Sequence, residues 1–184
     1  MSRRIRTAAF ALVLCGAALA FAQSSLWLDV PFVPQQKDGC GAASIAMVMQ
    51  YWQRQQHQSA SPASDYGQID HALYSASAHG IYASDMLRYF RQNGYRAFAF
   101  TGAWTDLQQH LAKGRPLIAA LKPGAGLPLH YVVVAGIDLA SHSVLVNDPA
   151  RRKLLKEDRN RFEREWAAAD HWTLLAVPEA SAHE

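Results

Sequence analysis

The sequence predicts an α+β fold in which helices dominate the first half of the domain and an antiparallel β-sheet the second. Helix-like segments occupy much of residues 41–92, whereas strand-like runs dominate from residue 95 onward. Two β-rich runs, 130–137 and 143–147, are separated only by a short polar turn, which is the pattern of a hairpin. Helices and strands that are segregated along the chain favour an antiparallel sheet.

The first 22 residues have the pattern of an export signal. Three arginines precede the apolar run 8–20, and Ala20-Phe21-Ala22 offers a small-x-small cleavage site. The run is shorter than the roughly 20 residues of a membrane span, and Leu14 before Cys15 argues against a lipoprotein signal. We expect a periplasmic or extracellular protein cleaved near Ala22; the alternative is an uncleaved signal that acts as a membrane anchor.

The net charge and the length of the remaining chain, residues 23–184, limit the class of protein that it can be. The full sequence carries 18 basic and 15 acidic residues, and removal of the signal takes away three arginines and no acid. The mature protein then has no net charge, which gives no basis for a nucleic-acid partner. Its length suits a single domain with a substantial core. Cys40 is its one cysteine, so an internal disulfide is impossible.

The elements expected in the first half are bounded by helix-breaking and capping residues. In order, they are an extended segment over 26–33 and helices over 41–56, 68–76 and 85–92. Pro31 and Pro34 keep the first segment out of a helix. The helix over 41–56 is apolar on most sides, so we expect it to be buried centrally. Ser84 can cap the last helix, which ends at Asn93-Gly94.

The second half alternates between short strands and two helices. We expect strands over 95–100, 117–121, 130–137, 143–147 and 172–177, and helices over 105–113 and 159–168. Thr105 can cap the first of these helices, and Gly114 ends it. Asp148-Pro149 breaks the second hairpin strand. The charged residues 151–158 are expected to form a connector.

Cys40 lies between two glycines at the point where a loop becomes the helix over 41–56. A helix N-terminus favours negative charge and activates a thiol placed there. Gln35, a few residues upstream, can offer a side-chain amide to a developing oxyanion. Cys40 is therefore a candidate nucleophile. The ordinary alternative is a small, buried, structural cysteine.

His130 and Asp148 are candidate partners of this nucleophile. A turn centred near Leu139 would place them directly opposite each other in the hairpin, with Cβ atoms roughly 5 Å apart on one face. A one-residue slip would put them on opposite faces. A carboxylate that orients an imidazole is the usual support of a cysteine nucleophile. Separately, each residue also has an ordinary interpretation, as a histidine that starts a strand and an aspartate that forms a turn.

Three motifs together resemble the bacteriocin-processing, double-glycine-leader peptidases and their stand-alone relatives, which are papain-like cysteine peptidases. They are Gln-x4-Cys-Gly-x-Ala at 35–43, His-Tyr-Val-Val-Val-x-Gly at 130–136 and Val-Asn-Asp-Pro at 146–149. The resemblance implies a papain-like fold over nearly all of the mature chain. It implies Cys40 as the nucleophile, His130 as the general base and later acid, and Asp148 as the orienting carboxylate. Gln35 matches the oxyanion-hole glutamine, with Gln36 as the alternative.

The predicted function is hydrolysis of peptide bonds in a peptide or protein substrate outside the cytoplasm. Relatives that cut double-glycine leaders are usually attached to an ATP-driven exporter, whereas this sequence has no Walker motif and begins with an export signal. The alternatives are an amidase or acyltransferase of the cell envelope that uses the same triad, and a non-catalytic peptide-binding module on the same fold.

No cofactor, metal or partner chain is expected. His57, His71 and His79 lack the spacing of a metal-binding pair on one helix. The basic run 151–153 has two interpretations. It either binds an acidic substrate at the rim of the cleft or is a solvated part of the connector.

Overall fold

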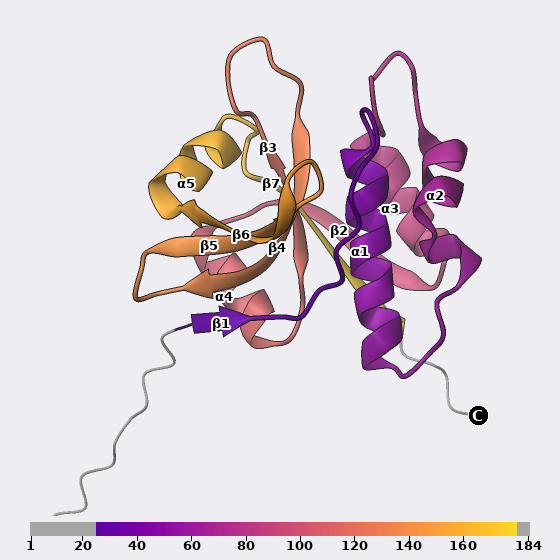
Figure 1. The fold of residues 1–184 in the computed structure, drawn as a ribbon, viewed down its shortest axis with the longest axis horizontal. Helices are drawn as coiled ribbons and strands as arrows, with labels where there is room; N and C mark the ends of the chain where they lie inside the picture. Colours follow the sequence, from indigo (N-terminus) through magenta and orange to yellow (C-terminus); the bar gives the residue numbers. More distant parts are fainter. Residues whose placement is uncertain (1–24, 180–184) are drawn as a thin grey trace, which may run out of the picture.

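The computed structural model describes residues 25–179, so the export signal expected over residues 1–22 lies outside the described residues. The described residues form a helical part and a sheet that lie side by side (Figure 1). The helices are α1 (Cys40–Gln55), the short 3-10 helix η1 (Pro62–Ser64), α2 (Tyr66–Leu73), α3 (Ala83–Gln92), α4 (Trp104–Ala112) and α5 (Arg159–Ala167). The strands are β1 (Ser25–Trp27), β2 (Tyr95–Thr101), β3 (Leu117–Leu121), β4 (His130–Asp138), β5 (Ser143–Asp148), β6 (Arg152–Asp158) and β7 (Trp172–Pro178).

The sheet has seven strands in the order β2-β7-β3-β4-β5-β6, and β1 adds to β4 outside this path. All of these pairings are antiparallel. The prediction of an α+β fold with an antiparallel sheet is therefore confirmed. Among residues 25–179, no helix combines the length and the hydrophobicity that crossing a bilayer requires.

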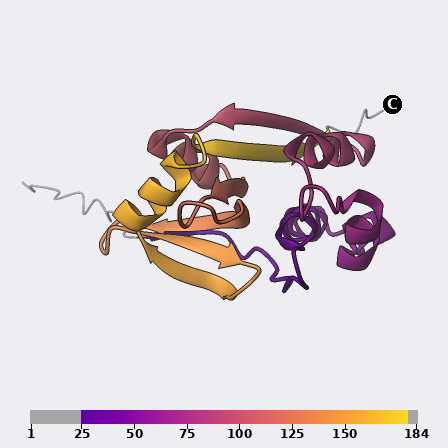
Figure 2. The same ribbon diagram turned by 90° about the horizontal axis from the view of Figure 1, so that it is seen from above.

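Different helices cover the two faces of the sheet (Figure 2). Helix α1 packs against the face that carries Tyr131 and Val133. Helices α4 and α5 pack against the other face, which carries Val132 and Val134. Because successive residues of a strand point to opposite faces, His130 shares the face of Val132. His130 is the first residue of β4, so it lies at the end of this strand.

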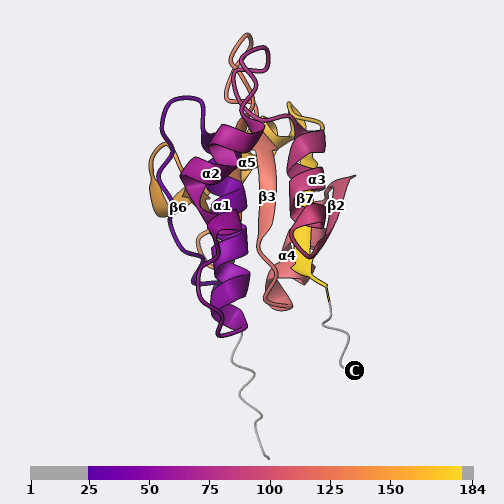
Figure 3. The same ribbon diagram turned by 90° about the vertical axis from the view of Figure 1, so that its right-hand side faces the viewer.

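Helix α1 is the central helix of the domain, as its apolar sequence predicted. Small residues, Ala42, Ala43 and Ala46, are fully buried along it and let it approach the sheet closely. Helix α2 lies beside α1, and α3 packs along β2 (Figure 3). These contacts fix the position of the α1 N-terminus, which carries Cys40.

A glycine lets β1 cross close to β4. A Cβ placed on Gly136 would lie 2.6 Å from the carbonyl oxygen of Leu26, and Trp27 is its partner in the strand pairing. Any side chain at this position would push β1 away. The glycine that ends the His-Tyr-Val-Val-Val-x-Gly motif therefore has a packing role, which ties the segment leading to Cys40 onto the strand that begins with His130.

The expected connector over 151–158 is wrong, because Arg152–Asp158 forms the edge strand β6. It pairs with β5, and only Leu155 in it is buried. Charged residues are depleted in most strands but are common on edges, where they discourage pairing with other chains. The charged sequence therefore hid the strand, and the expected extended segment over 26–33 pairs only at 25–27.

The expected caps of two helices are also wrong. Ser84 lies inside α3, which begins at Ala83 after Tyr82. Thr105 lies inside α4, where the Asp106 carboxylate instead accepts a hydrogen bond from the Ala103 N–H at 2.8 Å. In α4 a residue beyond the helix start makes the capping contact, and α3 has no side-chain cap at its N-terminus, so a search for the first Ser or Thr placed both boundaries too late. Helix α2 is shifted too: it spans 66–73 rather than 68–76.

Candidate active site

Cys40 is the first residue of α1, and its side chain is partly exposed. It is the free cysteine of the described residues. Its thiol lines an open cavity of about 420 Å³ together with residues 78–83 and the loop residues Pro128 and Leu129. A nucleophile at this place is accessible and faces a space into which a substrate can enter.

The loop before Cys40 is held by Tyr66, a residue that the sequence did not single out. The Tyr66 hydroxyl accepts a hydrogen bond from the Gln36 N–H at 3.0 Å. A Cβ on Gly39 would lie only 2.1 Å from the Tyr66 Oη. Burial raises the pKa of Tyr66 against the hydrogen bond from the Gln36 N–H, which lowers it, and the charges of Asp70 and Cys40 raise it further. A neutral hydroxyl therefore supports the loop next to the thiol.

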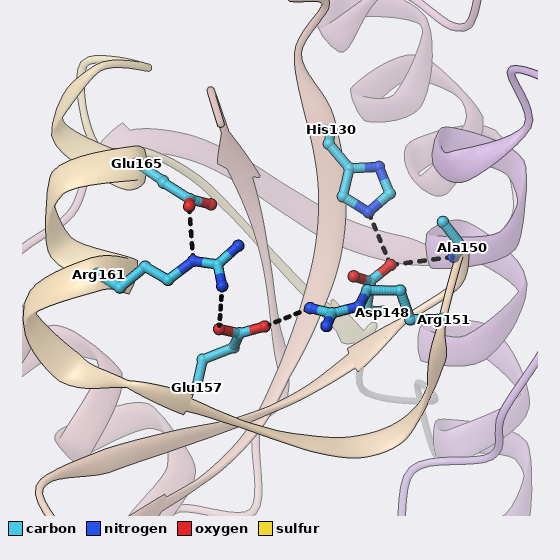
Figure 4. A network of polar contacts seen from close by, with 7 residues as sticks. All are labelled: His130, Asp148, Ala150, Arg151, Glu157, Arg161 and Glu165. Atoms are coloured by element: carbon cyan, nitrogen blue, oxygen red, sulfur yellow. Dashed lines mark hydrogen bonds and ion pairs between the residues drawn. The ribbon is translucent and has the colours of Figure 1, made fainter. Parts of the chain in front are cut away.

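His130 and Asp148 are joined by a short hydrogen bond. His130 Nε2 lies 2.8 Å from Asp148 Oδ1, and the two side chains are 22% and 9% exposed. The Ala150 N–H donates to the same carboxylate oxygen at 3.0 Å. This second bond fixes the carboxylate, which in turn fixes the plane of the imidazole and leaves Nδ1 on the other side of the ring (Figure 4).

The predicted register of the hairpin is wrong by two residues, although the predicted contact exists. Val133 pairs with Asn147, so the continuation of the ladder places Val132, not His130, opposite Asp148. The turn lies further along the chain than Leu139, and a bulge falls between Val134 and Gly136. A shift of two residues keeps both side chains on one face. His130 and Asp148 meet as diagonal neighbours.

The environment favours the charged imidazole. Burial opposes the charge on His130, but the hydrogen bonds with Asp148 and Cys40 and the charges of these two groups raise its pKa to about 9. For Asp148, burial also opposes the charge, and the His130 contact, the Ala150 N–H and the charge of Arg151 together lower its pKa. At neutral pH the pair is therefore an imidazolium and a carboxylate.

The two candidate glutamines lie in different surroundings. The backbone N–H of Gln35 donates to the carbonyl of Pro149 at 3.0 Å, which ties this residue to the turn that carries Asp148. Its side chain is partly buried, and Oε1 has no hydrogen-bond partner among the described residues. Gln36 is exposed. Of the two glutamines, Gln35 is therefore the one whose backbone is tied to the turn that carries Asp148.

Asn147 joins the strand of Asp148 to the segment that leads to Cys40. It is fully buried, and its side-chain amide donates to the carbonyls of Val30 and Pro31 at 3.1 Å each. Its Oδ1 accepts from the Leu154 N–H at 2.9 Å. The Val-Asn-Asp-Pro motif contained this residue, but its role depends on a partner more than a hundred residues away.

A chain of charged side chains continues beyond Asp148 (Figure 4). Arg151 Nη1 lies 2.7 Å from Glu157 Oε1, and Arg161 Nε lies 2.9 Å from Glu165 Oε1. Arg161 also approaches the second oxygen of Glu157 at 3.7 Å. Glu157 therefore lies between two guanidinium groups. Among residues 25–179, no group of three or more His, Cys, Asp and Glu side chains is arranged to hold a metal ion.

A thiol at the start of a central helix and a His–Asp pair at the end of the adjacent sheet define the class of cysteine hydrolases. The family model described as "Peptidase_C39 like family" matches residues 27–173, so the chain belongs to this family, and it is a cysteine-type peptidase. Among curated protein sequences, none matches the chain significantly.

Solved structures confirm the papain-like fold. A protein from Bacillus anthracis described as a candidate C39-like peptidase is 19% identical, with a TM-score of 0.67 over 85% of this chain and 99% of that one. A double-glycine-motif protease from an AMS/PCAT transporter, solved with its leader peptide, is 23% identical, with a TM-score of 0.61 over 83% and 94%. The peptidase domain of Streptococcus ComA, a bifunctional ABC transporter, is 20% identical, with a TM-score of 0.61 over 80% and 98%.

Proposed function

We propose that this chain hydrolyses peptide bonds with Cys40 as nucleophile, His130 as general base and acid, and Asp148 as the carboxylate that orients His130. The 2.8 Å contact between His130 and Asp148 carries the proposal, because it leaves the other ring nitrogen for Cys40. The raised pKa of His130 supports it, since Cys40 contributes to that shift. A structural cysteine has no need of this arrangement.

The chemistry proceeds through an acyl-enzyme. The Cys40 sulfur attacks the carbonyl carbon of the scissile bond and forms a C–S bond, while the carbonyl oxygen becomes an oxyanion. The Cys40 N–H at the start of α1 and the Gln35 side-chain amide stabilise that oxyanion. His130 then gives its proton to the leaving nitrogen, and the C–N bond breaks. Water then attacks the thioester carbonyl while His130 takes its proton, the C–S bond breaks, and the acid product leaves the Cys40 thiolate beside the His130 imidazolium.

The substrate class is a peptide or protein outside the cytoplasm. A leader peptide bound to the AMS/PCAT protease supports a peptide ligand for this fold. The signal-like N-terminus supports export, so cleavage of an envelope or extracellular peptide fits better than leader removal inside the cell. An amidase or acyltransferase would use the same groups but a different acceptor. A non-catalytic module would bind peptides without cleaving them.

A peptide library tests the proposal. Residues 23–184 are incubated with peptides randomised on both sides of the cleaved bond, and the products are read by mass spectrometry. We expect cleavage that is lost in Cys40→Ala, a substitution that keeps the small size of the side chain. Binding without cleavage would support the non-catalytic module, and products joined to an added amine instead of water would support the acyltransferase. Either result would contradict the proposed hydrolase.

A further inference from the structure

A second cavity lies on the other side of the candidate site from Cys40. It measures about 310 Å³, and its wall includes His130 and Asp148 but not Cys40. The alternation of side chains along β4 separates the two cavities, because Tyr131 lines the one with Cys40 whereas His130 and Val132 line this one. The candidate active site thus connects two spaces of different composition.

The chemistry of acyl transfer tells which part of a substrate reaches each space. The acyl part of the scissile bond becomes attached to the Cys40 sulfur, so it lies on the cysteine side. The leaving nitrogen receives its proton from His130, so it lies within hydrogen-bond reach of the imidazole. We expect the chain that follows this nitrogen to continue past His130, away from the sulfur. The cavity lined by His130 without Cys40 is therefore on the leaving-group side.

The lining of this cavity is apolar with a charged rim. Six residues make the apolar surface: Leu121, Pro123, Val132, Val146, Ala150 and Phe162. The charged groups on its wall are three cations and three carboxylates, joined in the contacts His130–Asp148, Arg151–Glu157 and Arg161–Glu165. Figure 4 shows these groups along an arc that runs from His130 down to Glu157 and up again to Glu165. The charges on the wall are already paired with one another, so a charged side chain would give up its water and find no unpaired charge in exchange. An apolar side chain has no polar group that loses water on entry.

We propose that this cavity is a subsite for an uncharged, apolar side chain on the leaving-group side of the scissile bond, at the residue directly after it. The proposal rests on the proposed function. The volume lies at the lower end of ligand sites, which span about 300–1,000 Å³, so it fits a side chain rather than a length of folded peptide. The cavity also gives Arg151 a role other than attraction of acidic substrates, because its charge is already paired with Glu157.

The first test varies the residue after the cleaved bond. The best peptide from the library is made with Leu, Met, Gly, Asp or Lys at that position, and kcat/KM is measured for each. We expect Leu and Met to exceed Gly by about tenfold or more, as filling an apolar pocket allows, with Asp and Lys at or below Gly. Cys40-dependent cleavage with equal rates, or with Asp preferred, would overturn the subsite but not the peptidase. Loss of all cleavage would instead overturn the proposed function.

The second test narrows the cavity from its rim. Ala150 is exposed in the turn after β5, and its contact with Asp148 is made by the backbone N–H, which Ala150→Leu keeps while it adds volume at the rim. We expect it to reduce the Leu-to-Gly ratio of kcat/KM by about fivefold or more, because the larger peptide side chain competes for the filled space. Ala140→Leu, an equally exposed alanine in the β4–β5 turn, is the matched control and keeps the ratio. An unchanged ratio in Ala150→Leu would overturn the proposal.

Discussion

Asp148 holds His130 from a diagonal position in the β4–β5 hairpin, at 2.8 Å between Oδ1 and Nε2. A diagonal pair lies further apart at the backbone than a directly opposed one. The side chains of Asp148 and His130 therefore bridge this longer distance at the end of β4. The imidazole extends past the sheet in this way, toward the thiol at the start of α1.

The pH dependence of the reaction follows from this contact. The pKa of His130 is raised to about 9, so the imidazolium needed as acid is present below that pH and is lost as the pH rises through it. Asp148→Asn removes the opposite charge, and we expect the alkaline limb of the kcat/KM profile to move down by roughly one pH unit or more. Asp138→Asn, which removes a carboxylate paired with Lys156 at the far end of the hairpin, is the control. Coincident limbs in wild type and Asp148→Asn would contradict the assignment.

The reactivity of Cys40 gives a prediction that needs no substrate. The imidazolium of His130 stabilises negative charge on the sulfur, and the thiolate is the form that alkylating reagents attack. We expect His130→Ala to slow alkylation by iodoacetamide at pH 6 by about tenfold or more. His71→Ala, on the exposed side of α2, serves as the control and keeps the wild-type rate. Equal rates for wild type and His130→Ala between pH 5 and 8 would show that the two groups do not interact.

The sequence allowed the correct prediction of features that depend on local patterns. The strand Leu117–Leu121 has the bounds that its apolar run predicted, and α1 is buried as its composition indicated. It did not reveal β6, because a charged edge strand is recognised only when its partner β5 is in place. The register of the hairpin also escaped prediction, because the turn lies between Asp138 and Ser143, beyond the expected centre at Leu139, and a bulge between Val134 and Gly136 shifts the pairing again. Periodicity carries no information about either event.

Some residues of the candidate site could likewise be found from the sequence, whereas others could be found only from the structure. Cys40, His130 and Asp148 stand in motifs whose spacing can be read, and the shared face of His130 and Asp148 survived an error of two in the register. Tyr66 could not be found, because it meets Gln36 from 30 positions away through a tertiary contact. Support of a site by packing leaves no pattern along the chain.

The contact between Gly39 and Tyr66 predicts a stability effect at the loop before Cys40. A Cβ on Gly39 would lie 2.1 Å from the Tyr66 Oη, so Gly39→Ala forces one of them to move. We expect a loss of about 1–3 kcal/mol in the free energy of unfolding. In a Tyr66→Leu background, Gly39→Ala is expected to lower the free energy of unfolding by less. Urea denaturation of the wild type, the two single variants and the double variant measures this difference. Gly124→Ala, whose Cβ would make ordinary contacts, is the control. Equal costs in both backgrounds would exclude the clash.

Asn147 predicts a larger loss of stability, because its amide serves three backbone groups, two buried carbonyls and one partly buried N–H. Asn147→Ala leaves the carbonyls of Val30 and Pro31 and the N–H of Leu154 without these partners. An unsatisfied buried polar group costs about 1–3 kcal/mol, so we expect a total loss of at least about 2 kcal/mol in the free energy of unfolding.

Asn147→Asp separates the donor role of the Asn147 side chain from its acceptor role. The carboxylate can still accept from Leu154 but faces two carbonyl oxygens without a proton to donate, so we expect destabilisation that lessens as the pH is lowered and the carboxyl group becomes protonated. Urea denaturation at pH 7 and pH 5 measures the change, with Asn93→Asp as the control. Asn93 also donates its amide to a carbonyl, that of Tyr89, but lies at the partly exposed end of α3. If Asn147→Asp were as stable as wild type at pH 7, the two carbonyl contacts would contribute nothing, and the link between the strand of Asp148 and the segment leading to Cys40 would have to depend on other contacts, such as the hydrogen bond from the Gln35 N–H to the Pro149 carbonyl.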